Sequence, residues 1–246
     1  MPQTVVYRLK DLHFHHPDLA FLSFLPKDPQ TRLIYQAGQY VTLKIADWTL
    51  PLSLAKAPDA QHALVFHLRI HPEDPAIQAL MAQLANDQTH DFYFTGPFGV
   101  MTTSTLKPNH ALVLLAGGTG IAPFKALLED LYLKHNTQVA VSLYWGISKP
   151  EDFYLSDLLE DLKTRYANFE YHLILSEPER FPAWQGQTGW LHEWILKQYQ
   201  TETIPRLTQS QVFASGPFEM IQKCLKTLTA LGLKREQFIS DIVPSS

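Results

Sequence analysis

The amino-acid sequence predicts two domains, an antiparallel β-barrel followed by an α/β domain built on a parallel sheet. In the first half, short runs rich in Val, Leu, Phe and Tyr are separated by Pro, Gly, Asp and Asn, a pattern typical of an all-β barrel or sandwich. From about residue 107, apolar runs alternate with helix-like segments, which favours a parallel sheet with helices on its faces. The boundary is expected near residues 102–110, giving domains 1–104 and 105–246.

The first domain is expected to consist of short strands with one helical insertion. The predicted strands are TVVYRLKDLHFH (4–15), LAFLSFLP (19–26), YVTLKIA (40–46), LPLSLAKA (50–57), ALVFHLRI (63–70) and DFYFTGPFG (91–99). The insertion, DPAIQALMAQLAND (74–87), is predicted to be a helix because its apolar residues recur at helical spacing on one face. That face carries Ile77, Leu80, Met81 and Leu84.

The second domain is expected to alternate strands and helices. Its predicted strands are ALVLLA (111–116), VAVSLYWG (139–146), YHLILSEP (171–178) and VFASGP (212–217). Its predicted helices lie near residues 121–134, 153–165, 188–199 and 217–231. Each strand is followed by turn-forming or polar residues, and ligands of such sheets bind at the carboxyl ends of the strands.

A glycine corner joins the first of these strands to its helix. Gly117, Gly118 and Gly120 fall within four positions, and Pro123 lies in the first turn of the predicted helix, where its missing N–H costs nothing. Glycine lets the backbone turn sharply and approach a ligand, and a helix N-terminus offers unpaired N–H groups and partial positive charge. The corner therefore predicts a cradle for the pyrophosphate of a dinucleotide. Neither the G-x-G-x-x-G fingerprint nor the Gly-Lys-Ser/Thr phosphate loop is present, and a tight turn without a ligand is the alternative.

Composition limits the classes of function. The net charge of −4 and the lack of any basic run argue against a nucleic-acid surface. With one cysteine, Cys224, the chain forms no internal disulfide and supplies no cysteine-ligated cluster, and this thiol is expected to be buried in a helix. The N-terminus has no signal-peptide profile and no run approaches membrane-spanning length, so we expect a soluble, cytoplasmic protein. His13 and His15 share one face of a predicted strand, but without a third ligand we expect no metal site.

Several motifs match one family in order along nearly the whole chain. They are AGQYVTL (37–43), LPLSLA (50–55), GPFG (96–99), AGGTGIAP (116–123), YWGISKPEDFYLSDL (144–158) and ASGPFEM (214–220). In these motifs the sequence resembles the ferredoxin–NADP reductase superfamily, and most of all its short bacterial NAD(P)H:flavin oxidoreductases. The resemblance implies a six-stranded flavin-binding (FAD or FMN) Greek-key barrel, a five-stranded parallel sheet that binds NAD(P)H, and hydride transfer from nicotinamide C4 to flavin N5. Cofactors carry such chemistry, and the protein mainly supplies position.

The resemblance also implies roles for individual residues. Ser53 would place its hydroxyl against flavin N5, and Thr119 would lie near the nicotinamide, so these two are the catalytic candidates. The cofactor-binding candidates are Pro51, Leu52, Ser53, Leu68 and Arg69 for the flavin, and Gly117, Gly118, Thr119, Gly120, Ile121, Pro123, Ser148, Lys149, Gly216, Pro217 and Phe218 for the dinucleotide.

Three departures from the family pattern concern the flavin. Leu50 and Leu52 stand where the family has Arg and an aromatic residue. The chain therefore lacks a guanidinium that could donate to flavin oxygens and an aromatic side chain that could stack on the flavin ring. Glu73 and Asp74 precede the inserted helix, where they suit its dipole and repel a bound phosphate. Ser215 replaces a cysteine that often precedes Gly-Pro. We therefore expect a weakly bound flavin (riboflavin, FMN or FAD), which the protein uses as a substrate.

Two other functions stay open. A flavin-containing reductase would pass electrons to a protein acceptor, such as an oxygenase or an iron–sulfur protein, and a non-catalytic nucleotide-binding module would have lost flavin altogether. The choice between NADH and NADPH is also open, because Lys149 favours a 2′-phosphate whereas Glu151 and Asp152 oppose it. We expect no nucleic-acid and no membrane partner.

Overall fold

The computed structural model describes residues 2–86, 90–201, 207 and 209–241. The chain divides into two compact units. The first contains Met1–Thr103 together with Ala122–Lys134, and the second contains Ser104–Ile121 together with His135–Ser246. The helical segment that follows the glycine corner thus groups with the first unit. Within the described residues, no helix has the length and apolar character needed to cross a membrane.

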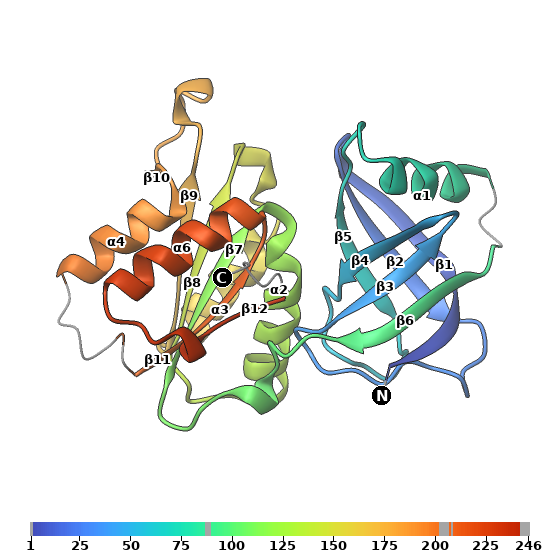
Figure 1. The fold of residues 1–246 in the computed structure, drawn as a ribbon, viewed down its shortest axis with the longest axis horizontal. Coiled ribbons are helices and arrows are strands. Elements are labelled where there is room, and N and C mark those ends of the chain that lie inside the picture. The colour runs from blue at the N-terminus through green and yellow to red at the C-terminus, as the bar shows by residue number, and fades with distance from the viewer. Residues whose placement is uncertain (1, 87–89, 202–206, 208, 242–246) are drawn as a thin grey trace. The chain divides into compact units, whose positions relative to one another are not determined.

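The first unit is built on one antiparallel sheet that curls on itself (Figure 1). Its strands are β1 (Gln3–His16), β2 (Leu19–Pro26), β3 (Tyr40–Ile45), β4 (Trp48–Ser53), β5 (Leu64–Arg69) and β6 (Phe92–Phe98). The strand order is β4-β3-β6-β1-β2-β5, so β6 inserts between β3 and β1. The two edges of the sheet approach each other, because the Ala55 N–H, just beyond β4, donates to the Val65 carbonyl of β5 at 2.8 Å. The predicted antiparallel fold is confirmed in the form of a curled, half-barrel sheet.

Alternating side chains and one helix form the core of this unit. In β5, Leu64, Phe66 and Leu68 are buried while the residues between them are partly exposed, as expected of a strand with one face in the core. Helix α1 (Pro75–Asn86) lies across one end of the sheet and contributes its predicted apolar face to the same core (Figure 1). Of that face, Ile77, Leu80 and Leu84 are buried, and Met81 is partly buried.

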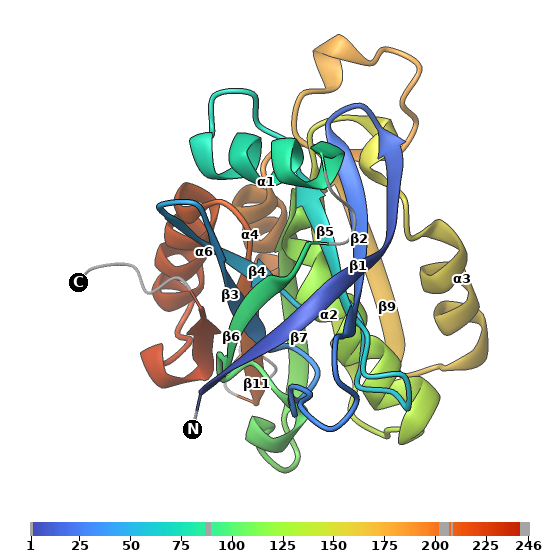
Figure 2. The ribbon, with the colours of Figure 1, turned by 90° about the vertical axis from the view of Figure 1, so that its right-hand side faces the viewer.

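The second unit is a parallel sheet covered by helices. Its strands are β7 (Ala111–Gly117), β8 (Val141–Ile147), β9 (Phe169–Leu175), β10 (Gln187–Thr188), β11 (Ser210–Ser215) and β12 (Phe238–Ser240). The main helices are α3 (Ser156–Arg165), α4 (Leu191–Thr201) and α6 (Phe218–Ala230), with short 3₁₀ turns at η1 (Thr103–Thr105), η4 (Pro150–Asp152), η5 (Pro178–Arg180) and η6 (Arg235–Gln237). Figure 2 shows α3 on one side of the sheet and α4 with α6 on the other.

The sheet has six strands in the order β10-β9-β8-β7-β11-β12, one more than the five expected. The additional edge strand, β10, consists of two residues beside β9, too few to leave a periodic signal in the sequence. From β7 the chain first adds β8 and β9 on one side and later adds β11 and β12 on the other. The order therefore reverses between β7 and β11, and in open α/β sheets ligands bind in the crevice at the carboxyl ends of strands at such a point.

The predicted helix at residues 121–134 is a composite of three helical geometries. A 3₁₀ turn, η2 (Gly118–Ile121), leads into α2 (Ala122–Leu128), which continues as the π-helical segment η3 (Glu129–Lys134). The apolar residues that recur at helical spacing along it are buried, namely Ile121, Phe124, Leu127, Leu128 and Leu131.

Candidate functional site

The glycine corner lies at the carboxyl end of β7, at the point where the strand order reverses. Gly117 is the last residue of β7 and pairs with Gly146 of β8. On the other side, Ala116 pairs with Ser215, the last residue of β11. The turns that follow β7 and β11 are therefore neighbours at the same edge of the sheet.

Gly120 of the corner and Gly216 of the turn after β11 let these neighbouring turns pack backbone to backbone. A Cβ on Gly120 would collide with the Ser215 carbonyl, and a Cβ on Gly216 would lie 2.9 Å from the Cα of Gly117. A Cβ on Gly117 would lie 2.6 Å from the Met220 sulfur of α6. Real Cβ atoms do not approach other atoms this closely, so the side-chain positions of these glycines are filled by the protein itself.

Gly118 differs from its neighbours because the space beside it is open. Its φ is +52°, a left-handed conformation that favours glycine, and a Cβ there would meet no atom within 4 Å. The Gly118 carbonyl accepts a hydrogen bond from the indole Nε1 of Trp145 at 2.9 Å, and Trp145 is fully buried in β8. The hydrogen bond ties the corner to β8, and no protein atom covers the position that a Gly118 side chain would take.

Sequence reasoning did not single out Trp145, although the residue lies in one of the matched motifs. The sequence did offer a reason to expect this bond. A buried indole N–H needs an acceptor, and the backbone closest to the end of β8 is the turn that follows the neighbouring strand β7.

The other predicted dinucleotide residues lie at the same edge of the second unit. Ser148 directly follows β8, and its hydroxyl donates to the buried Asp152 carboxylate at 3.2 Å. Lys149 caps the 3₁₀ turn η4. Pro217 is the N-cap of α6, and Phe218, the first residue of that helix, keeps 39% of its surface exposed. The structure thus brings together the predicted residues that follow β7, β8 and β11. Pro123 is buried at the start of α2, in the segment that groups with the first unit.

The predicted flavin residues belong to the first unit and differ in exposure. Ser53 is partly exposed at the end of β4, and Pro51 is exposed. Leu52 and Leu68 are buried in the core of the curled sheet. Arg69, at the end of β5, forms an ion pair with Asp18 at 3.1 Å, so its guanidinium is already compensated. Their contact with a flavin stays a prediction.

The N-terminus of α1 is occupied by a side chain of the protein. The Asp74 carboxylate accepts hydrogen bonds from the backbone N–H groups of Ala76 and Ile77, at 2.9 and 3.2 Å. These are donors that a phosphate at a helix N-terminus would use, and here a carboxylate has taken them. The residues present at this helix therefore do not fit a phosphate group.

Two titratable groups have strongly perturbed pKa values. Burial, and to a lesser degree the positive charge of Lys125, lower the pKa of His67 to about 3, so this imidazole is neutral at physiological pH. Burial raises the pKa of the Cys224 thiol to about 12, which confirms the expected packed thiol of a core helix. Among the residues that the structure describes, no cluster of three or more His, Cys, Asp or Glu side chains is arranged to hold a metal.

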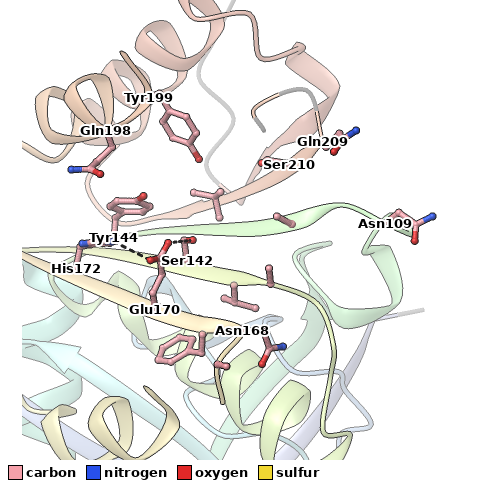
Figure 3. Close-up of a pocket in the computed structure, with 16 residues that line it drawn as sticks. Asn109, Ser142, Tyr144, Asn168, Glu170, His172, Gln198, Tyr199, Gln209 and Ser210 are labelled. Atoms are coloured by element: carbon pink, nitrogen blue, oxygen red, sulfur yellow. Dashed lines mark hydrogen bonds and ion pairs between the residues drawn. The ribbon is translucent and has the colours of Figure 1, made fainter. Parts of the chain in front are cut away.

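A separate polar cavity of about 480 Å³ lies at the opposite edge of the parallel sheet (Figure 3). Its lining includes the first residues of β7, β8, β9 and β11, so the cavity opens at the amino ends of these strands. Inside it Ser142 donates to Glu170 at 2.6 Å, and the His172 ring stacks on Tyr144 with 4.8 Å between centroids. None of the predicted site residues lines this cavity.

Comparisons with known proteins agree with the fold. Residues 114–226 match the family described as the oxidoreductase NAD-binding domain. Over 244 residues the chain is 32% identical to the CDP-6-deoxy-L-threo-D-glycero-4-hexulose-3-dehydrase reductase of Yersinia pestis, covering 99% of this chain and 70% of that protein.

Two solved structures share the fold at low sequence identity. The cytochrome P450 reductase GcoB of Amycolatopsis has a TM-score of 0.80 at 19% identity, with 98% of this chain and 69% of that chain covered. A ferredoxin NADP⁺ reductase from Neisseria gonorrhoeae, solved with bound FAD and NADP, has a TM-score of 0.76 at 20% identity, with 97% of this chain and 98% of that chain covered.

Proposed function

Because the chain belongs to the ferredoxin–NADP reductase superfamily and is an NAD(P)H-dependent oxidoreductase, we propose that it transfers a hydride from NAD(P)H to a flavin that it holds weakly. The nicotinamide supplies the hydride and the flavin accepts it, and both cofactors are those of the family. The residues of this chain supply binding and orientation, which can account for a large part of the rate of such a reaction.

The observation that carries this proposal is the open α-carbon of Gly118 at the reversal of strand order. Around it Gly120 and Gly216 pack against neighbouring backbone and Trp145 bonds the Gly118 carbonyl, whereas the space beside the Gly118 α-carbon is open. An open backbone position at the start of a helical segment suits a pyrophosphate, because the first N–H groups of a helix have no partner within the helix and can donate to a phosphate. In this proposal Gly118 and Thr119 contact the pyrophosphate and the nicotinamide, and Ser148 and Lys149 contact the adenosine ribose.

The first unit supports a flavin that is bound without strong phosphate contacts. The α1 N-terminus is capped by Asp74, and the Arg69 guanidinium is paired with Asp18, so neither offers free positive potential to a phosphate. Ser53 is partly exposed and would direct its hydroxyl at flavin N5. We expect purified protein to lose its flavin on dialysis, and stoichiometric FAD retained through dialysis would contradict weak binding.

A second candidate is a reductase that passes electrons onward to a protein. The name of the Yersinia relative describes a reductase of a dehydrase, and the Amycolatopsis structure is a cytochrome P450 reductase. In this alternative the flavin stays bound during turnover and a separate protein accepts the electrons.

Steady-state oxidation of NADH and NADPH, with and without added riboflavin, FMN or FAD, separates the candidates. Turnover that depends on free flavin supports flavin as the substrate. Turnover with a dye or protein acceptor but without added flavin supports the reductase with bound flavin. No oxidation in any mixture would contradict both and would leave a non-catalytic nucleotide-binding module.

A further inference from the structure

Each of the five residues that follow Ser53 has at least one backbone group in a hydrogen bond. The N–H groups of Leu54 and Ala55 donate to the carbonyls of Gln39 and Val65, at 3.0 and 2.8 Å. The Lys56 carbonyl accepts from the hydroxyl of Tyr35 at 3.0 Å. These contacts tie one side of the segment to β5 and to the residues that precede β3.

Side chains from the helical segment Ala122–Lys134 hold the other side. The Lys125 ammonium donates to the Ala55 carbonyl at 3.0 Å, and the Glu129 carboxylate accepts from the Ala57 N–H at 3.0 Å. The Lys134 ammonium donates to the Pro58 carbonyl one turn further along. We call the Lys125–Glu129 pair, with its bonds to Ala55 and Ala57, the clasp.

The clasp is not an ordinary surface ion pair. The Lys125 and Glu129 side chains are only 20% and 21% exposed, and each makes a bond to backbone in addition to their mutual ion pair. A Lys that precedes a Glu by four residues is the weaker orientation for helix stability. The helix also changes from α to π geometry at Glu129, a change often found at functional sites. The pair is thus better explained by what it holds than by what it adds to its own helix.

Each half of the clasp lies a few residues after one of the two candidate catalytic residues along the covalent chain. Ser53 precedes the clasped Ala55 by two residues. At the other end, the helical segment that carries Lys125 continues directly from the corner containing Thr119. A change in the clasp therefore acts on the backbone that leads to each of these residues.

We propose that Lys125 and Glu129 are positioning residues for hydride transfer, which hold the backbone after Ser53 against the helix that begins at the dinucleotide corner. This inference rests on the proposed function. Neither side chain needs to touch a cofactor, because the effect is transmitted through the backbone of Ala55 and Ala57. Small displacements of reacting groups reduce rates steeply, and a shift of about 1 Å can cost on the order of 100-fold.

The test compares variants of the clasp with a matched ion pair elsewhere. Lys125→Met and Glu129→Ala remove the bonds, whereas Lys125→Arg and Glu129→Gln keep a donor and an acceptor and also serve if the first pair folds poorly. The control is Arg165→Met, which breaks the Arg165–Asp161 pair at the same four-residue spacing on α3. Three quantities are measured: the single-turnover rate of flavin reduction by saturating NADH, the dissociation constants of NADH and flavin, and amide hydrogen exchange at Ala57 in the flavin-free protein.

We expect Lys125→Met and Glu129→Ala to slow flavin reduction by about 10- to 100-fold while each dissociation constant changes by less than about 2-fold. Lys125→Arg and Glu129→Gln should recover most of the rate, and Arg165→Met should leave it unchanged. Exchange of the Ala57 amide should accelerate in Glu129→Ala but not in Glu129→Gln.

Several results would overturn the inference alone. These are a wild-type rate in both Lys125→Met and Glu129→Ala, an equal loss in Arg165→Met, or a rate loss fully explained by weaker binding of NADH or flavin. If the wild-type protein reduces no flavin, the proposed function fails and this inference fails with it, while the exchange of Ala57 still reports whether the clasp forms.

Discussion

Replacing Gly118 with valine tests the proposed dinucleotide cradle at its most exposed point. The wild-type φ of +52° favours glycine, and a β-branched residue there is strained. The new side chain would project into space that is empty of protein atoms within 4 Å of its Cβ. It would therefore leave the fold intact and block whatever binds over the corner.

The expected magnitudes follow from these two effects. The left-handed strain costs about 1–2 kcal/mol of stability, which lowers Tm by about 2–8 °C for a chain of this size. Loss of one hydrogen bond to a charged phosphate costs about 1.5–3 kcal/mol, so the dissociation constant of NADH should rise by about 10- to 150-fold. Gly118→Ala, with a single methyl group, should fall between wild type and Gly118→Val.

Gly232→Val is the matched control, because Gly232 also has a positive φ, of +98°, and open space around its missing Cβ, but follows α6 far along the chain from the corner. NADH binding is measured by titration calorimetry and stability by thermal unfolding. We expect both variants to lose stability and only Gly118→Val to lose affinity. Undiminished NADH affinity in Gly118→Val, or an equal loss in Gly232→Val, would refute the cradle.

Substitutions at four further positions probe other contacts. Ser53→Ala should slow hydride transfer by about 10-fold or more if the hydroxyl stabilises charge that develops at flavin N5, and an unchanged single-turnover rate would remove it from the mechanism. Trp145→Phe leaves the Gly118 carbonyl without its indole donor, and we expect a stability loss of about 1–3 kcal/mol in urea unfolding together with weaker NADH binding. Asp74→Ala removes the α1 cap and should cost about 1 kcal/mol in the same assay, whereas Asp74→Asn should cost less and neither should affect NADH affinity. His67→Phe should make the protein less sensitive to acid. The pKa of His67 is about 3 in the native protein and 6.5 ordinarily, so between pH 7 and pH 5 only the unfolded chain takes up a proton at this residue. Over that range the free energy of unfolding should fall by up to about 2 kcal/mol more in wild type than in the variant.

Most of the fold was predictable because the sequence carries local, repeated signals. All the predicted barrel strands occur within a few residues of their expected bounds, since their ends are marked by Pro, Gly and Asp. The strands β10 and β12 were not predicted, because segments of two and three residues are too short to show a period. Their places are set by pairing with β9 and β11, which is a property of the assembled sheet.

The candidate site was predictable in part, for the same reason. The corner was visible because its glycines adjoin one another in sequence, and the acidic residue at the start of α1 was visible because capping is local. Which glycines are packed against protein and which one is open could not be predicted, because this depends on Ser215 and Met220, which are about a hundred residues away. The Lys125–Ala55 and Glu129–Ala57 hydrogen bonds join residues that are 70 and 72 positions apart, and no local sequence pattern predicts such contacts.

The most direct test of the central claim is anaerobic mixing of the protein and flavin with NADH, in which loss of flavin absorbance is followed in time. We expect the flavin to be reduced in a single fast phase, and NADH carrying deuterium at nicotinamide C4 to reduce it more slowly. At NADH concentrations that just saturate the wild-type protein, Gly118→Val should greatly reduce this phase. Flavin absorbance that does not change on mixing with NADH or NADPH would contradict hydride transfer by this protein.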